Sequence, residues 1–229
     1  QTHYPTVRDL LARVREMMSV LTDPSLAFPH GEIYDLREAL ARIRIEGLFM
    51  DEAELFSLRK MLDYAGQLER FFDTLDKVKY PLLSNSSQSE RPISNNFINN
   101  VTSAIDKIID RYGKMRDNAS PELARIRKEI SASQGSVSRA LNAILRQAQA
   151  EGILDKDAAP TMREGRLVLP VPPAYKRKIG GIVHDESATG KTVFIEPQQV
   201  VEANNRIREL EGEERRERMR ILMAITAEI

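Results

Sequence analysis

Residues 120–150 read SPELARIRKEISASQGSVSRALNAILRQAQA, a run that predicts one long helix. Ser120 is a good N-cap, and Pro121 suits the first helical position because that position needs no N–H donor. The apolar positions alternate between spacings of three and four residues, with one polar member: Leu123, Ile126, Ile130, Ser133, Val137, Ala140 and Ile144. This alternation is typical of a coiled-coil seam. A helix over residues 121–150 is about 45 Å long, and Gly152 ends it.

A second long helix is expected to open at Pro197. Its apolar positions keep the same alternation at first and restore an apolar face after a charged stretch: Val200, Ala203, Ile207, Leu210, Ile221, Leu222 and Ile225. Three short runs between the helices carry β signals, with a turn at Thr189–Gly190. These runs are residues 166–171 (RLVLPV), 179–184 and 191–196 (KTVFIE).

The order of these elements predicts two antiparallel arms joined by a small β tip. We expect an outgoing lever helix within residues 116–152, a clamp-like tip in 153–197 and a returning lever helix in 198–229. A plain helical bundle with a β insert is the alternative.

Residues 1–115 predict a helical core, so the fold class is mainly α. Helical periodicity marks residues 5–21, 32–46, 52–79 and 95–112. The first of these carries its apolar face on Val7, Leu10, Leu11, Val14 and Met18. Asp51 can cap the third helix and Pro81 is expected to stop it. The polar run 84–92 is expected to be a mobile loop, because it lacks apolar anchors.

Composition excludes some classes of function without selecting one. Lysine plus arginine and aspartate plus glutamate both number 34, so a basic surface for nucleic acid has to be local. The absence of cysteine excludes disulfides and thiolate metal sites and fits a reducing, cytoplasmic setting. No apolar run approaches the ~20 residues of a membrane helix. Because the chain starts at Gln1 and its last residues keep a helical pattern, we expect both ends to be cuts.

No set of residues predicts catalysis, a metal site or a cofactor in this chain. Gly190-Lys191-Thr192 invites a phosphate-loop interpretation, but Asp185 stands where the motif requires glycine. The motif also opens a strand instead of a helix, so a hairpin turn is favoured. His184 with Asp185 and Glu186 is better explained as a polar turn than as metal ligands.

Positive charge becomes local between residues 163 and 184. Five basic residues there face one acid, Glu164, a net charge of +4: Arg163, Arg166, Lys176, Arg177 and Lys178. Pro172-Pro173 is a stiff approach that would present the last three outward. Contact with a phosphate backbone needs such a patch, while an ordinary soluble tip is the alternative. Tyr175 is expected to pack against the strands.

The last helix alternates arginines with glutamates between residues 206 and 220. This pattern chiefly indicates an exposed helix laced by salt bridges, and a nucleic-acid stripe is the alternative.

Several motifs at the tip and its flanks resemble the second bacterial type of MutS protein, a paralogue of the mismatch-repair protein that usually ends in an Smr nuclease domain. They are REGRLVLPV (163–171), GIVHDESA (181–188), FIEP (194–197), DNASPELARIR (117–127) and VVEANN (200–205). Residues 32–72 are similar to the helical core of that family more loosely.

The resemblance implies a homodimeric ATPase that closes paired arms around nucleic acid. ATP and Mg are then expected in an ATPase domain outside these 229 residues, as is any Smr endonuclease. We expect this chain to be the non-catalytic lever and clamp region, with DNA as partner. The alternative within the family is a module that binds RNA or stalled ribosomes. A stand-alone enzyme is disfavoured.

Overall fold

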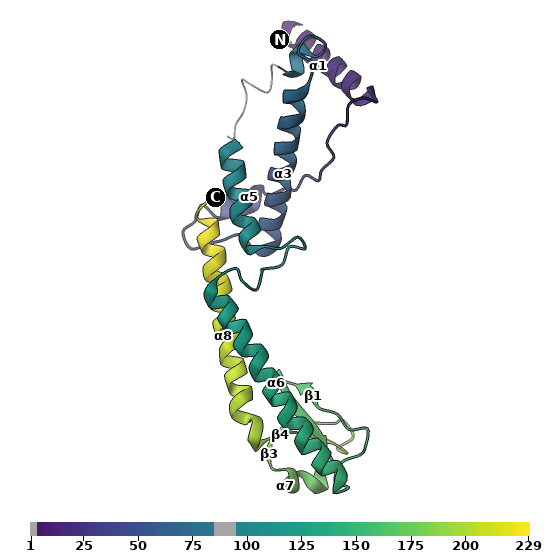
Figure 1. Ribbon diagram of the computed structural model, residues 1–229, viewed down its shortest axis with the longest axis vertical. Helices are drawn as coiled ribbons and strands as arrows, with labels where there is room; N and C mark the ends of the chain where they lie inside the picture. The colour runs from purple at the N-terminus through teal and green to yellow at the C-terminus, as the bar shows by residue number, and fades with distance from the viewer. Residues whose placement is uncertain (1–3, 85–94) are drawn as a thin grey trace. The chain divides into compact units, whose positions relative to one another are not determined.

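The computed structural model describes residues 4–84 and 95–229, which form two compact units. One unit comprises residues 1–119 and 220–229, and the other comprises residues 120–219. The chain is mainly helical with one small antiparallel sheet, as expected (Figure 1). None of the helices within the described residues has the length and apolar character needed to cross a membrane.

The regular elements of the first unit are helices, and among its described residues an isolated antiparallel bridge also joins Ile109 to Met115. The unit contains α1 (Tyr4–Thr22), α2 (Arg37–Arg42), α3 (Glu52–Thr74), α5 (Asn95–Ile108) and the last residues of α8 (Gln198–Thr226). Asp51 caps α3 as predicted, in a capping box with Glu54. The backbone N–H of Met50 donates to Thr226 Oγ1 at 3.0 Å, which joins the end of α8 to the start of α3.

Three predicted helices are shorter than expected. The helix predicted over 32–46 is confined to Arg37–Arg42, because the Asp35 carboxylate accepts from the N–H of Arg37 at its start and three-residue turns follow its end. Before it, the backbone at Gly31 lies directly against the ring of Tyr64. A Cβ at that glycine would stand 2.4 Å from the ring. The third helix ends at Thr74 instead of residue 79, because the Asp76 carboxylate binds the N–H groups of the next turn.

The fourth helix ends at Ile108 instead of residue 112. Asp110 accepts hydrogen bonds from two later backbone N–H groups and so forms a turn. Pro81 starts a short helical turn that reaches Ser84, although we expected it only to stop a helix. The predicted mobile loop 84–92 lies outside the described residues, apart from Ser84.

The second unit contains both long helical arms and the sheet. α6 spans Pro121–Ala150 as predicted, with the Ser120 hydroxyl accepting from the N–H of Leu123. The strands are β1 (Thr161–Arg163), β2 (Arg166–Val171), β3 (Gly181–Glu186) and β4 (Val193–Pro197), in the order β1-β2-β4-β3 with every neighbour antiparallel. Sequence reasoning found β2, β3 and β4 but missed the three-residue β1. It also missed the single helical turn α7 (Lys176–Ile179).

Within this unit α6 and α8 run antiparallel, and polar contacts join the first part of α6 to the later part of α8. Ser120 at the start of α6 donates to Glu217 at 2.6 Å. Arg127 lies 2.8 Å from Glu214, and Glu129 lies 2.7 Å from Arg206. Arg206 also pairs with glutamates of its own helix, so the prediction of salt bridges is confirmed for this arginine.

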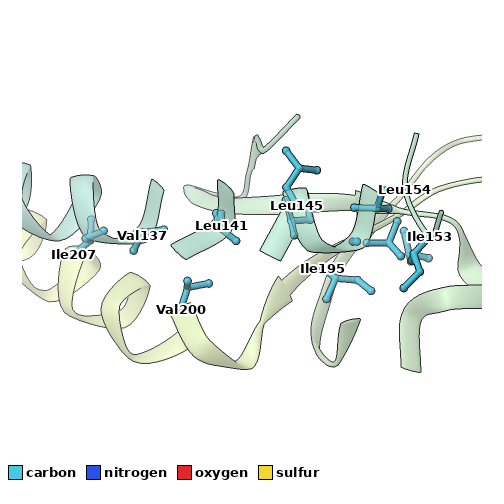
Figure 2. Packing of buried hydrophobic residues seen from close by; sticks show 12 residues of the cluster. Val137, Leu141, Leu145, Ile153, Leu154, Ile195, Val200 and Ile207 are labelled. Carbon is cyan, nitrogen blue, oxygen red and sulfur yellow. The ribbon is translucent and has the colours of Figure 1, made fainter. Parts of the chain in front are cut away.

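Nearer the sheet the arms share an apolar core. Figure 2 shows Val137, Leu141 and Leu145 of α6 in this cluster with Val200 and Ile207 of α8. The buried positions of α6 therefore change from the predicted seam, since Leu141 and Leu145 replace Ala140 and Ile144. A helix with 3.6 residues per turn drifts relative to a strict heptad, and four-residue steps keep one face on the sheet. Sheet residues that meet this face are Leu169, Val171, Val193 and Ile195.

Candidate nucleic-acid interface

The basic run Lys176-Arg177-Lys178 forms the turn α7 at the tip. A 3-10 turn, Pro173–Tyr175, leads into α7, and Gly180 leaves it with a φ of 65°. Tyr175 and Ile179, which bracket the run, pack against the core cluster of the unit, as predicted for Tyr175. The three basic side chains are exposed. Anchors on both sides of so short a turn fix where these three charges stand.

The charges on α7 have no acidic partner within the described part of the chain. The nearest aromatic contact is that of Lys178 Nζ, 5.8 Å from the centroid of the Tyr175 ring. A cation over a ring keeps its full charge. Three unneutralised charges on one rigid turn are therefore available to an anionic ligand.

Arg166, a second predicted contact, is engaged inside the tip. Its guanidinium donates to Glu196 Oε1 at 2.7 Å and to Asn205 Oδ1 at 2.6 Å. Its side chain is only 13% exposed. A guanidinium held by two internal acceptors contributes to the architecture of the tip and offers little to a phosphate.

Arg163 lies over the sheet and is also partly neutralised. Its guanidinium carbon stands 4.1 Å from the centroid of the Phe194 ring, and its Nε stands 3.1 Å from Asp185 Oδ2. Within the described residues, the structure thus separates the five predicted residues into a set on α7 without acidic partners and a paired set, Arg163 and Arg166, on the sheet.

The polar centre of the tip is Glu196, which sequence reasoning missed. This carboxylate is completely buried and accepts hydrogen bonds from Arg166, Asn204 at 2.7 Å and His184 at 2.6 Å. Burial alone would raise the pKa of Glu196, but these hydrogen bonds outweigh it and hold the pKa below its ordinary value. The signal in the sequence was an acid inside an otherwise apolar strand.

His184 belongs to this network and lies inside β3. The prediction of a polar turn at His184, Asp185 and Glu186 is wrong, because all three residues lie in β3. The turn comes later, where Gly190 N–H donates to the Ser187 carbonyl at 2.8 Å. The network joins β2, β3, β4 and α8, so it fixes the sheet to the returning helix.

Gly190-Lys191-Thr192 lies in the hairpin between β3 and β4, as predicted. Thr192 is followed by β4 and not by a helix, so the backbone N–H groups that cradle phosphates in a phosphate loop are not assembled. The residues present do not fit ATP at this motif.

Comparison with known proteins places this chain beside one kind of bacterial protein. It is 36% identical over 201 residues to Endonuclease MutS2 of a Geobacillus species and 35% identical over 204 residues to that of Halalkalibacterium halodurans. The Ruminiclostridium cellulolyticum protein of the same name is 35% identical over 231 residues, which is 99% of this chain. The chain spans about a quarter of the length of these relatives, so it resembles one region of them. No model of a known protein family matches it.

Proposed function

We propose that this chain is the non-catalytic lever and clamp region of a MutS2-like dimeric ATPase and that its tip contacts DNA through α7. The observation that carries the proposal is that Lys176, Arg177 and Lys178 are exposed on one short turn and have no acidic partner among residues 4–84 and 95–229. The similarity to proteins named Endonuclease MutS2 supports a setting in which nucleic acid is handled.

The contact proposed is to the phosphate backbone and not to bases. A single helical turn of four residues is too short to enter a groove and present several side chains to base edges. Lysine and arginine side chains on such a turn can reach phosphates, which gives binding that is nearly independent of sequence and strongly dependent on salt.

In this proposal the two long helices of the second unit carry the tip, and ATP and Mg act in a domain outside these residues. The Glu196 network would make the sheet and the start of α8 move as one body. Binding at α7 would then be coupled to the helices through rigid contacts and not through a flexible loop.

The test removes the three charges by a triple substitution, Lys176→Ala, Arg177→Ala and Lys178→Ala, in the full-length protein. The matched control removes three exposed charges from α8, by substituting alanine for Arg208, Arg215 and Arg216. Binding to duplex DNA and to ribosomes is measured over a salt series. Removing one phosphate-binding charge should reduce the slope of log affinity against log salt by about 0.9 on duplex DNA.

The tip variant should bind DNA more weakly and show a slope smaller by up to about 2.7, while the control variant keeps the native affinity and slope. A DNA-binding defect only in the control variant would assign the DNA contact to the arginines of α8 and refute the proposal. Weaker ribosome binding with DNA binding intact would favour the ribosome as partner. Unchanged affinity and slope for both ligands would exclude α7 as a nucleic-acid contact.

A further inference from the structure

The helix α1 turns its apolar face toward solvent. Along its 19 residues a large apolar side chain recurs at alternating spacings of four and three, and each is between 40% and 61% exposed: Val7, Leu11, Val14, Met18 and Leu21. Leu10 lies beside this row and is 57% exposed. A contiguous apolar stripe of this length on a folded unit marks an interaction surface.

The opposite face of α1 explains why the stripe is left outside. Val20 is buried against Leu75 and Tyr80 in the small core of the unit. The carboxylate of Glu16 accepts from the N–H groups of Leu82 and Leu83 at 3.0 Å each. These contacts hold the helix by its less apolar side, so the stripe cannot rotate inward without breaking them.

The charged residues beside the stripe indicate which charge a covering segment should carry. In heptad terms, Arg8 and Arg15 occupy one flank, whereas the two acids of residues 7–22, Asp9 and Glu16, lie on the side of the helix opposite the stripe. A shallow groove of about 360 Å³ runs between them and the stripe, lined by Val7, Arg8, Leu11, Ala12 and Arg15. In helix pairs the flanking positions set the choice of partner through opposite charges. The groove therefore fits a helix with acidic residues on the facing flank.

A second copy of α1 fits this surface poorly. In an antiparallel pair Arg8 would face Arg15 of the other copy, so like charges would meet twice. In a parallel pair whose seam is the row through Leu11, Val7 and Val14 would take the d positions with Leu11 at an a position. That is the reverse of the arrangement preferred by two-stranded coils.

We propose that the α1 stripe docks an amphipathic helix with acidic residues opposite Arg8 and Arg15, supplied by polypeptide outside these 229 residues. The chain spans about a quarter of the length of its relatives, so a covering helix within the same polypeptide has ample sequence to come from. Linkage in one polypeptide gives such a helix a high effective concentration.

The first experiment tests the charge preference on the 229-residue chain. Two synthetic helical peptides share one leucine seam and carry either glutamate or lysine at the flanking positions, and fluorescence anisotropy measures their binding. The glutamate peptide should bind about fivefold to tenfold more tightly, and the double substitution Arg8→Glu, Arg15→Glu should reverse that preference. Equal binding, or none, would overturn the proposal.

The second experiment tests the source of the covering helix. The chain has no cysteine, so Leu11→Cys introduces one reactive thiol, and Val78→Cys, at a position 91% exposed, serves as control. Mass spectrometry follows labelling at these two sites in the 229-residue chain and in the full-length protein. Labelling at position 11 should be at least about tenfold slower in the full-length protein, with position 78 unchanged.

Three outcomes would contradict the proposal that the covering helix belongs to the same polypeptide. Equal labelling at position 11 in both proteins would mean that no part of the longer polypeptide covers the stripe. Protection that disappears on dilution to monomers would assign the stripe to a second copy. Co-sedimentation of the 229-residue chain with anionic vesicles, abolished by Leu11→Glu with Met18→Glu, would assign it to a lipid surface.

Discussion

Replacing Glu196 with glutamine is expected to destabilise the second unit without removing any bulk. The carboxylate is 0% exposed, and its two oxygens accept from Arg166, His184 and Asn204. The amide keeps one acceptor but loses the negative charge, so the guanidinium of Arg166 loses its charged partner. Breaking a buried ion pair on one side costs about 3–5 kcal/mol.

The geometry lowers the expected cost of Glu196→Gln below the middle of that range. Arg166 is 13% exposed and keeps its bond to Asn205 Oδ1 at 2.6 Å. Water and this second acceptor recover part of the loss, so we expect about 2–4 kcal/mol for Glu196→Gln. Arg166→Met should cost a similar amount, and the two changes together should cost less than their sum by about 1.5–3 kcal/mol.

Urea unfolding can measure these costs in the second unit alone. The chain contains no tryptophan, and Tyr175 packs against the core of this unit, so Tyr175→Trp gives a local fluorescence signal. The reporter is combined with each single variant and with the double variant. Additivity of the two costs within about 0.5 kcal/mol would refute the argument that Arg166 and Glu196 stabilise the tip as a pair.

Three further predictions concern the same fold. Because the folded pKa of Glu196 lies below its ordinary value of 4.5, its stabilising contribution is complete above that value and is lost as pH falls through the folded pKa. The pKa of Glu129 in the same unit is also lowered, so thermal unfolding should show a smaller acid-dependent loss in Glu196→Gln than in the native chain, and not its complete absence. Gly181→Ala should prevent correct pairing of β3 with β4, because its Cβ would stand 2.1 Å from the Glu196 carbonyl oxygen at a φ of 136°. Gly190→Ala should be milder, because its Cβ would stand 3.2 Å from the end of a flexible side chain. Far-UV circular dichroism and the tryptophan reporter compare the two variants. Gly135→Ala and Gly212→Ala should each stabilise the chain by about 0.5–1 kcal/mol, because both glycines lie inside long helices. The nearest atoms to the new Cβ are 3.4 Å and 3.5 Å away, so neither methyl group clashes. A lower unfolding midpoint for either variant would contradict this prediction.

Local patterns in the sequence were sufficient wherever a neighbour within a few residues sets the structure. The start of α6 follows from Ser120 and Pro121, and the start of α3 follows from Asp51 with Glu54. The turn at Thr189–Gly190 predicted the strand that became most of β4, and its place before a strand excluded a phosphate loop. These features depend on side chains that cap a helix, on the backbone freedom of glycine and on the missing N–H donor of proline, all of which act within a short segment.

Burial depended on partners far along the chain, whereas the early ends of α3 and α5 come from the nearby carboxylates of Asp76 and Asp110. The backbone at Gly31 is set by the ring of Tyr64, and no local rule predicts that approach. The buried face of α6 turns from Ala140 to Leu141 because the sheet packs there. The buried faces of helices respond to such contacts because local preferences differ by only a few tenths of a kcal/mol.

The sequence by itself determined the positive character of the tip and the mainly helical fold, because charge and periodicity are written along the chain. Only the tertiary structure decided which charges are available. It brought Glu196 of β4 to Arg166 of β2, and so withdrew that arginine from the surface. It left Lys176 to Lys178 exposed on α7, because a four-residue turn anchored on both sides has no acid within reach among the described residues. A charge is neutralised by what folding places near it, and that neighbour can lie 30 residues away, as it does for Arg166.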